Sequence, residues 1–511
     1  MTDPDCFLRT DHVAADLKRT AVRGGTITIT AQGLKFLLSI GATMALARLL
    51  TPGDFGLVAM VAAFTGFVAV FKDLGLAMAT VQRPSIDHRQ VSTLFWLNLL
   101  ISAAVMVSVA ALAPAVAWFY KEPRLLGVTL ALGATFLFGG LTVQHHALLR
   151  RQMRFGALAG IEIGALLAGA AAAVVLALAG AGYWALVLRP IAVAAATAAG
   201  VWILCGWRPG HPTRGSGVRA MLAFGGNLTG FSLVDYFSRN LDNVLIGWRW
   251  REQQLGFYSR AYQLLLLPLQ QINAPLASVA IPTLSRLQDD PARYRRYYCN
   301  AMSLLAYVAT PFIVGMIVLS DEVIAIVLGN QWMEAGRLFR VLAIAALGQP
   351  AAAANGWVYI SLGRARRLLA WGLISMPIFA AGFVVGLRWG ALGVAAAYAI
   401  CALALRVPGW LFAFHGSPIR LRDLAAATWR PTAISVALLG AMAAVRAAVA
   451  GEALLVRLVL PAATGIVTLV LLILMWPQAR GDVARLLDTA RALRSEPYRA
   501  EPGAAHERAA R

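Results

Sequence analysis

The sequence predicts an all-α integral membrane protein with about 14 transmembrane helices. These helices are expected to form two pseudo-symmetric six-helix bundles followed by a C-terminal helix pair. Three observations support this prediction: an apolar composition, a regular alternation of apolar stretches with basic loops, and an internal repeat. The 511 residues are 59% hydrophobic and only 14% charged, and the mean hydropathy is +0.68. A soluble protein of this size cannot bury so much apolar surface, so the apolar stretches are assigned to a membrane.

Apolar stretches of roughly 20 residues or more recur along the chain, and each is long enough to cross the hydrocarbon core of a bilayer. Their predicted positions are 25–47, 55–77, 92–118, 125–148, 157–180, 182–204, 219–248, 257–285, 297–319, 335–362, 367–386, 391–413, 429–448 and 453–476. The predicted domains are a cytoplasmic segment (1–24), an N-terminal bundle (25–207), a linker (208–218), a C-terminal bundle (219–414), helices 13 and 14 (415–476) and an Arg-rich cytoplasmic tail (477–511).

The charge distribution fixes an expected orientation. The chain carries 45 Lys and Arg against 24 Asp and Glu, for a formal net charge of +21. Most of these bases fall in loops on the side of the N-terminus, which places that side and both termini in the cytoplasm. A nucleic-acid partner is not predicted, because the bases do not cluster on a soluble domain. The four cysteines lack CxxC spacing, so no metal site is expected, and no cofactor is expected either. No GxxxxGK[ST] loop is present, so ATP hydrolysis by that route is not expected.

The two halves of the chain repeat each other at a separation of roughly 200–213 residues. Phe55-Gly56-Leu57-Val58 follows the first span, and Leu255-Gly256-Phe257-Tyr258 follows the seventh. Farther along, FYKEPRLLGVTLALGATF (119–136) resembles WMEAGRLFRVLAIAALGQ (332–349). Because six spans is an even number, both copies share one orientation and are related by an axis along the membrane normal.

The first span carries a polar stripe at helical spacing. Gln32, Lys35 and Ser39 lie on one face, which predicts the wall of a wet cavity. Lys35 lies roughly ten residues from either end of the span, so it is interpreted as a positive charge that faces an anionic substrate. The alternative is a lysine whose ammonium group reaches the membrane interface.

The seventh and eighth spans carry more charge at membrane depth. Asp235, Arg239 and Asp242 share a face with Asn227 on or near it. Asp235 and Arg239 are four residues apart, so mutual neutralisation is an alternative to a functional role. Asp242 is interpreted as an ion- or proton-coupling group, or alternatively as a partner for Arg260 in the next span.

Three other charged residues lie within predicted spans. They are Glu162, Arg189 and Arg406. Each is interpreted as one member of an ion pair between helices, because an unpaired charge is costly in a membrane.

Several motifs resemble the Wzx/WzxC-type polysaccharide flippases of the multidrug/oligosaccharidyl-lipid/polysaccharide exporter superfamily. They are LARLLTPGDFGLVAM, DLGLAMATVQRP, STLFWLN, RNLDNVLIG and LGFYSRAYQLLLLPLQ, and the resemblance runs in order from Gly24 to Phe414. It implies two six-helix bundles around a cavity walled chiefly by helices 1, 2, 7 and 8, together with a helix 13/14 pair. It also implies that oligosaccharide repeat units on undecaprenyl diphosphate are moved across the bacterial inner membrane by alternating access driven by an ion gradient.

This resemblance gives the polar residues expected roles. The diphosphate-linked glycan is expected to contact Gln32, Lys35, Asn227, Arg239 and Arg260, and ion coupling is assigned to Asp235 and Asp242. The other expected partners are membrane lipids and a polysaccharide polymerase with its co-polymerase.

Three alternative functions remain open. A cation-coupled multidrug exporter predicts a cavity rich in acids and aromatic rings, whereas the charge within these spans is about five bases to three acids. A membrane polymerase or ligase needs catalytic side chains on large outer loops, and the outer loops here are short. An uncoupled lipid scramblase or a scaffold is the third alternative.

Overall fold

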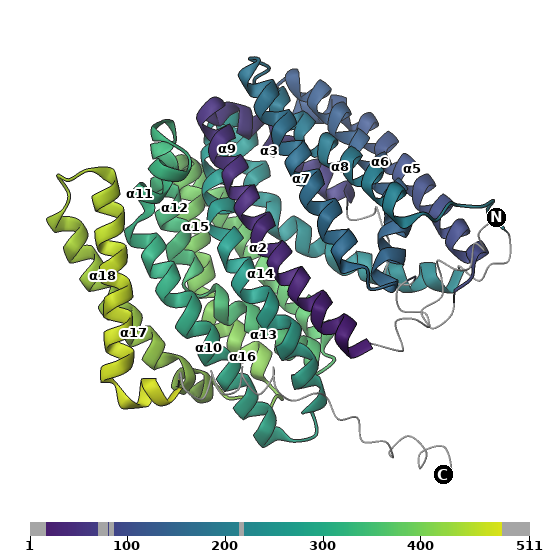
Figure 1. Ribbon diagram of the computed structural model, residues 1–511. Coiled ribbons are helices and arrows are strands. Elements are labelled where there is room, and N and C mark those ends of the chain that lie inside the picture. Colours follow the sequence, from purple (N-terminus) through teal and green to yellow (C-terminus); the bar gives the residue numbers. More distant parts are fainter. Residues whose placement is uncertain (1–16, 70–79, 81–85, 214–218, 483–511) are drawn as a thin grey trace, which may run out of the picture. The chain divides into compact units, whose positions relative to one another are not determined.

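The computed structural model describes residues 17–69, 80, 86–213 and 219–482, without the side chains of 17–23, 67–69, 219–235 and 237–239. Within these ranges every regular element is a helix, which confirms the all-α prediction (Figure 1). The elements are α2 (Leu17–Leu49), α3 (Pro52–Ala69), α5 (His88–Tyr120), α6 (Arg124–Arg151), α7 (Phe155–Leu178), α8 (Trp184–Cys205), α9 (Arg219–Arg286), α10 (Pro291–Val318), α11 (Ser320–Val327), η2 (Asn330–Trp332), α12 (Met333–Ala346), α13 (Gln349–Ser361), α14 (Ala365–Gly386), η3 (Leu387–Trp389), α15 (Gly390–Ala404), α16 (Arg406–Phe414), α17 (Leu421–Ala448) and α18 (Leu454–Met475).

Among the described residues, ten helical segments are long and apolar enough to cross a membrane. The number is eleven if the bent pair Asn330–Ala346 and Gln349–Ser361 forms one span. Two of the ten, Asn240–Arg286 and Ala365–Phe414, contain 47 and 50 residues, whereas one crossing needs roughly 20. The prediction of a multi-pass membrane protein is therefore confirmed, and the figure of 14 helices is not.

The outward face of α18 shows what surrounds the protein. Leu455, Ile466 and Met475 are all largely exposed along this helix. Such an apolar surface favours aggregation in water, whereas the hydrocarbon tails of lipids cover it at no cost.

The chain divides into two compact units, which we describe separately. Unit 1 contains the chain up to Leu264 with Val323–Leu342 and Leu369–Cys401, and unit 2 contains the remainder. The domain boundaries given above remain predictions.

The helices α5, α6, α7 and α8 form the core of unit 1 and lie side by side in Figure 1. At the start of α5, the Asp87 carboxylate accepts the Gln90 backbone N–H at 2.6 Å, which satisfies a free donor at the helix end. One turn further, Phe95 packs with the buried Trp207 and Leu148. This bundle supplies a rigid wall for the site described below.

The long helix α9 reverses direction at Arg251. This residue has φ 63° and ψ −170°, which are not helical angles. The Tyr258 hydroxyl donates to the Asp242 carboxylate at 2.6 Å, although the two residues are 16 positions apart. In a straight helix they would be separated by about 24 Å, so the chain must fold back. The reversal falls between the predicted spans 219–248 and 257–285, whose bounds remain predictions.

The start of α3 crosses the second half of α9 at two glycines. Gly56 lies against the carbonyl oxygen of Glu252, and Gly256 lies against that of Pro52. A Cβ atom at either glycine would overlap the opposing backbone, so no other residue fits there without separating the helices. The two copies of the internal repeat therefore touch each other through equivalent positions. We call this contact the glycine crossing.

Unit 2 contains the C-terminal helix pair that the sequence predicts, with α10 packed on α17 and α17 packed on α18 (Figure 1). The Glu322 carboxylate, which is fully buried at the start of α11, accepts from Arg446 at 3.1 Å and from Arg457 at 2.8 Å. Arg446 also donates to Asp321 at 2.9 Å. Because Arg446 lies in the last turn of α17 and Arg457 in the first turn of α18, this network joins both helices to the start of α11.

Candidate functional site

Two arginines inside unit 1 have no acidic partner among the side chains that the structure describes. Arg260 lies in the second half of α9, where its guanidinium carbon is 4.9 Å from the centre of the Phe55 ring in α3. Its Nε atom is buried and has no hydrogen-bond partner in the described part of the chain. Arg189 lies in α8, close enough to Arg260 for the two charges to repel each other. We call Arg189 and Arg260 the cation pair.

The electrostatics of the cation pair favour an anionic ligand. A charged side chain at membrane depth costs about 2.5–3.5 kcal/mol even before repulsion is considered. The ring of Phe55 offsets part of this cost through a cation–π contact. No ion pair of Arg189 or Arg260 with a carboxylate occurs among the described side chains. An anion bound close to both guanidinium groups would reduce the repulsion and supply an acceptor to the Arg260 Nε atom, which has none among the described residues.

A cavity of about 530 Å³ opens between α3, α6 and α8 in the same unit. We call it the hydroxyl cavity, because four threonines line it: Thr65, Thr135, Thr142 and Thr197. Pro190, which follows Arg189 in α8, also lines it. The lining of the cavity therefore includes the residue that directly follows one member of the cation pair in the sequence.

Lys35 does have an acidic partner. Its ammonium group donates to the Glu162 carboxylate at 2.5 Å, and this ion pair joins α2 to α7. The interpretation of Glu162 as one member of an ion pair between helices is confirmed. The same contact neutralises the charge of Lys35, so a role for Lys35 in holding substrate stays a prediction. Gln32, on the same stripe, is exposed.

The Lys35–Glu162 pair can be tested by removing one charge or both. We expect Lys35→Met to lower export, because Glu162 is left as an unpaired carboxylate at membrane depth. We expect the double variant Lys35→Met/Glu162→Gln to recover most of the lost export, since neither position then carries a charge. Polysaccharide export in cells, corrected for the amount of protein in the membrane, measures both. A double variant as inactive as the single one would mean that the ammonium group itself acts on substrate.

No ion pair of Arg189 is found among the described side chains, where Glu162 is bound to Lys35. The interpretation of Arg189 as one member of an ion pair between helices therefore stays a prediction. The excess of bases over acids within the spans was the signal that at least one base would remain unmatched.

Asp242 is held by a tyrosine rather than by an arginine. Its carboxylate is 5% exposed and accepts from the Tyr258 hydroxyl at 2.6 Å and from the Asn243 backbone N–H at 2.8 Å. The alternative interpretation, in which Asp242 pairs with Arg260, is therefore wrong. The side chains of the other predicted residues of the seventh span, Asn227, Asp235 and Arg239, lie outside the described residues.

A short chain of charges joins the turn between α5 and α6 to the reversal within α9. Arg124 donates to Glu122 at 2.7 Å and to Glu252 at 3.1 Å. The hydrogen bonds from Arg124 hold the pKa of the Glu122 carboxyl below its usual range. Glu252 takes part in both features, since its carboxylate binds Arg124 and its carbonyl oxygen faces Gly56. The charged residues Glu122, Arg124 and Glu252 therefore lie beside the glycine crossing.

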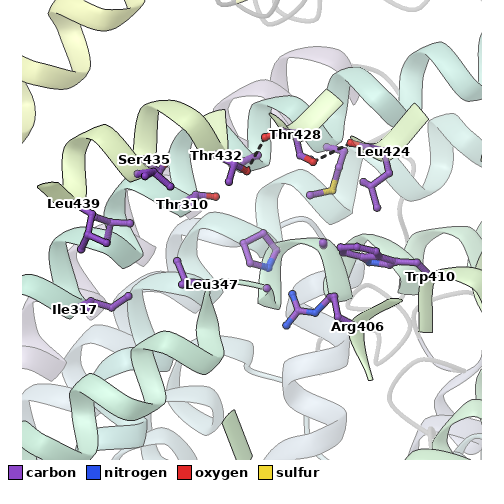
Figure 2. Close-up of a pocket in the computed structure, with 17 residues that line it drawn as sticks. Thr310, Ile317, Leu347, Arg406, Trp410, Leu424, Thr428, Thr432, Ser435 and Leu439 are labelled. Carbon is purple, nitrogen blue, oxygen red and sulfur yellow. Dashed lines mark hydrogen bonds between the residues drawn. The ribbon is translucent and has the colours of Figure 1, made fainter. Parts of the chain in front are cut away.

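Unit 2 has a cavity of its own, of about 240 Å³, between α10, α13, α16 and α17. We call it the α17 cavity. Figure 2 shows Arg406 and Trp410 of α16 across from Thr428 and Thr432 of α17. Thr432 donates to the carbonyl oxygen of Thr428 at 2.7 Å. The Arg406 guanidinium lies against Gly348 at the break between α12 and α13 and donates to the Ala402 carbonyl at 3.5 Å. Since Arg406 is engaged with the backbone, the cation pair is the stronger candidate for an anion site.

Comparison with known proteins places this fold and site in a family. The family described as polysaccharide biosynthesis protein matches residues 45–337. The teichuronic acid biosynthesis protein TuaB of Bacillus subtilis (strain 168) is 28% identical over 356 residues, which are 68% of this chain and 73% of TuaB. The lipopolysaccharide biosynthesis protein WzxC of Escherichia coli (strain K12) is 24% identical over 385 residues, which are 74% of this chain and 77% of WzxC.

The fold is shared with a solved transporter structure. The lipid II flippase MurJ in an inward closed conformation aligns with 89% of this chain and 99% of its own, with a TM-score of 0.70 at 12% identity. The family match covers more than half of the chain, including α3, the cation pair and the glycine crossing. The resemblance to Wzx-type polysaccharide flippases that the motifs indicated is confirmed, and the chain belongs to the polysaccharide biosynthesis protein family.

Proposed function

We propose that this protein flips oligosaccharide repeat units, linked to undecaprenyl diphosphate, across the bacterial inner membrane during exopolysaccharide or lipopolysaccharide biosynthesis. The observation that carries this proposal is the cation pair, two repelling positive charges inside a membrane protein of a polysaccharide family. A diphosphate and its sugars cannot enter hydrocarbon unaided, because each polar group would lose its hydrogen bonds with water. A protein that replaces those bonds with arginine donors lowers this barrier.

In this proposal the diphosphate binds between Arg189 and Arg260 while the prenyl chain remains in the lipid. Gln32, Lys35, Asn227 and Arg239 are proposed as further contacts of the glycan or its diphosphate. Both termini are proposed to lie in the cytoplasm, and a polymerase with its co-polymerase would use the exported repeat units. The names of TuaB and WzxC, which refer to teichuronic acid and lipopolysaccharide biosynthesis, support a polysaccharide precursor as the cargo.

We further propose that transport proceeds by alternating access, with the glycine crossing as the contact that opens and closes. Its support is that the two repeat copies approach each other there backbone to backbone, at Gly56 and Gly256. Surfaces of this kind separate without rearranging a packed core, which suits a contact made and broken in every cycle.

The glycine crossing can be locked with a disulfide. A Cβ atom at Gly53 would lie 3.6 Å from the Cγ atom of Glu252, which is within reach of a disulfide between cysteines at these positions. In a chain whose four native cysteines are replaced, we expect oxidised Gly53→Cys/Glu252→Cys to lose transport and to regain it on reduction. Reconstituted vesicles with a fluorescent lipid-linked sugar provide the measurement. The oxidised single variants are the controls, and a fully cross-linked protein with normal transport would overturn the opening of this contact.

We propose Asp242, with Asp235, as the ion-coupling group. The support is that Asp242 is buried and bound to the Tyr258 hydroxyl, so that gain of a proton or cation would change the charge inside unit 1.

The proposed function is tested on spheroplasts with and without the protein. An external lectin or glycosidase that reaches lipid-linked repeat units only when the protein is present supports the proposal. Repeat units that face outward in both strains but stay unpolymerised would indicate an enzyme instead. If neither accessibility nor polymerisation depends on the protein, the proposal fails, and drug efflux becomes the function to test.

A further inference from the structure

The hydroxyl cavity has the size of a small-molecule site, and its described lining carries no charge. Its volume of about 530 Å³ lies within the roughly 300–1,000 Å³ typical of ligand pockets. All lining residues that the structure describes are uncharged, and besides the four threonines they include Phe136 and Phe138. The cavity is therefore suited to a neutral ligand with both polar groups and apolar surface.

The threonines present acceptors rather than donors. Thr65, Thr135 and Thr142 each donate their hydroxyl proton to a carbonyl oxygen of their own helix, at 3.1, 2.7 and 2.8 Å. A hydroxyl whose proton is used in this way can still accept hydrogen bonds through its lone pairs. The cavity thus offers acceptors from two helices to a ligand rich in O–H or N–H donors. A prenyl chain would leave these acceptors unused, whereas a sugar would satisfy them.

The hydroxyl cavity shares α8 with Arg189 and shares α3 with Phe55, the aromatic contact of Arg260. On α8, Pro190 lines the cavity directly after Arg189. On α3, Val58 lines it one helical turn after Phe55, the ring on which Arg260 rests. Along the chain, residues that line the cavity thus come within about one helical turn of both Arg189 and Phe55.

We infer that the hydroxyl cavity binds the uncharged sugar that is attached directly to the diphosphate of the lipid-linked substrate. This inference rests on the proposed function and adds to it a chemical requirement. The cation pair selects the diphosphate, and the threonine acceptors of α3 and α6 select a neutral sugar with free hydroxyl groups next to it.

The test compares two probes on the purified full-length protein in lipid nanodiscs. The first probe is farnesyl diphosphate, and the second is the same molecule with one N-acetylglucosamine on its terminal phosphate. We expect wild-type protein to bind the sugar-bearing probe about tenfold more tightly or better. We expect Thr65→Val and Thr142→Val each to reduce this preference about three- to tenfold, and neither to change the affinity for farnesyl diphosphate.

A matched control comes from the α17 cavity. Thr432→Val removes a hydroxyl that donates to its own helix in the same way, so it should leave the preference unchanged. Equal affinity of wild-type protein for the two probes would overturn the inference, as would a preference that survives both Thr65→Val and Thr142→Val. If Thr432→Val instead loses the preference for the sugar-bearing probe, the sugar binds in the α17 cavity, and the inference is overturned.

Two further results separate this inference from the proposed function. If farnesyl diphosphate does not bind, or binds equally well to Arg260→Gln, the proposed function fails whatever the threonine variants do. If the threonine variants do not fold, Ala194→Leu replaces them, since Ala194 lines the same cavity and a larger side chain there fills it. Loss of the sugar preference in Ala194→Leu with unchanged farnesyl diphosphate binding supports the inference, and retention of the preference overturns it.

Discussion

Replacement of Arg260 by glutamine is expected to lower transport of the lipid-linked glycan by about 10- to 100-fold. Its guanidinium group carries a positive charge in the membrane, and a charge-assisted hydrogen bond to a phosphate is worth about 1.5–3 kcal/mol. Arg260→Lys should retain part of the activity, because it keeps the charge but loses the planar fork that binds two phosphate oxygens. The measurement is the rate of transport in reconstituted vesicles, at equal amounts of inserted protein.

The stability of Arg260→Gln separates a functional role from a structural one. Because the cation pair has no acidic partner among the described residues, removal of one charge relieves repulsion and should leave the melting temperature unchanged or raised. Arg249→Gln is the matched control, since Arg249 lies on the same helix, also rests on an aromatic ring and is exposed. A lower melting temperature for Arg260→Gln with normal transport would mean that Arg260 supports the fold and not the cargo.

Replacement of Glu322 by alanine is expected to give a large loss of stability, of about 3–5 kcal/mol. Glu322 is fully buried between Arg446 and Arg457, and its removal leaves the Arg457 guanidinium without the carboxylate it contacts. We expect the melting temperature of the detergent-solubilised protein to fall by on the order of 5 °C. The double variant Glu322→Ala/Arg457→Gln should recover part of this loss, because it removes the stranded charge.

The exposed Glu452 in the turn between α17 and α18 provides a control for this prediction. Glu452→Ala should leave the melting temperature unchanged, because an exposed surface charge contributes little to stability. An equal effect of Glu322→Ala and Glu452→Ala would show that the buried network does not hold α17 and α18 to α11.

Much of the fold was predictable because it depends on local sequence. The apolar stretches predict helices of membrane-spanning length, since the backbone can satisfy its own hydrogen bonds in lipid only in a closed pattern. The reversal near Arg251 was also predictable, because charged and polar residues interrupt the apolar pattern there. The number of spans was harder to predict, since neither composition nor length says where a continuous helical segment such as Ala365–Phe414 bends.

The candidate site was only partly predictable. Arg260 and the charged residues near it were recognised because ionisable side chains are costly at membrane depth. The sequence did not indicate that Arg189 lies near Arg260. A sequence shows how deep a charged residue lies in the membrane, but it does not show which residues of other helices pack against it. The hydroxyl cavity gave no signal at all, since threonines are common in membrane helices and these four are spread over three of them.

By itself, the sequence determined that this protein is a helical membrane protein of a polysaccharide family, with charges at membrane depth. Those properties follow from composition, helical periodicity and short motifs, which act over a few residues. Only the tertiary structure decided which charges are neutralised. Lys35 meets Glu162, 127 positions away, because α2 packs on α7, and Asp242 meets Tyr258 because α9 folds back. Among the described side chains these contacts leave Arg189 and Arg260 without an acid, because an ion pair forms only between helices that the packing of the whole chain brings together.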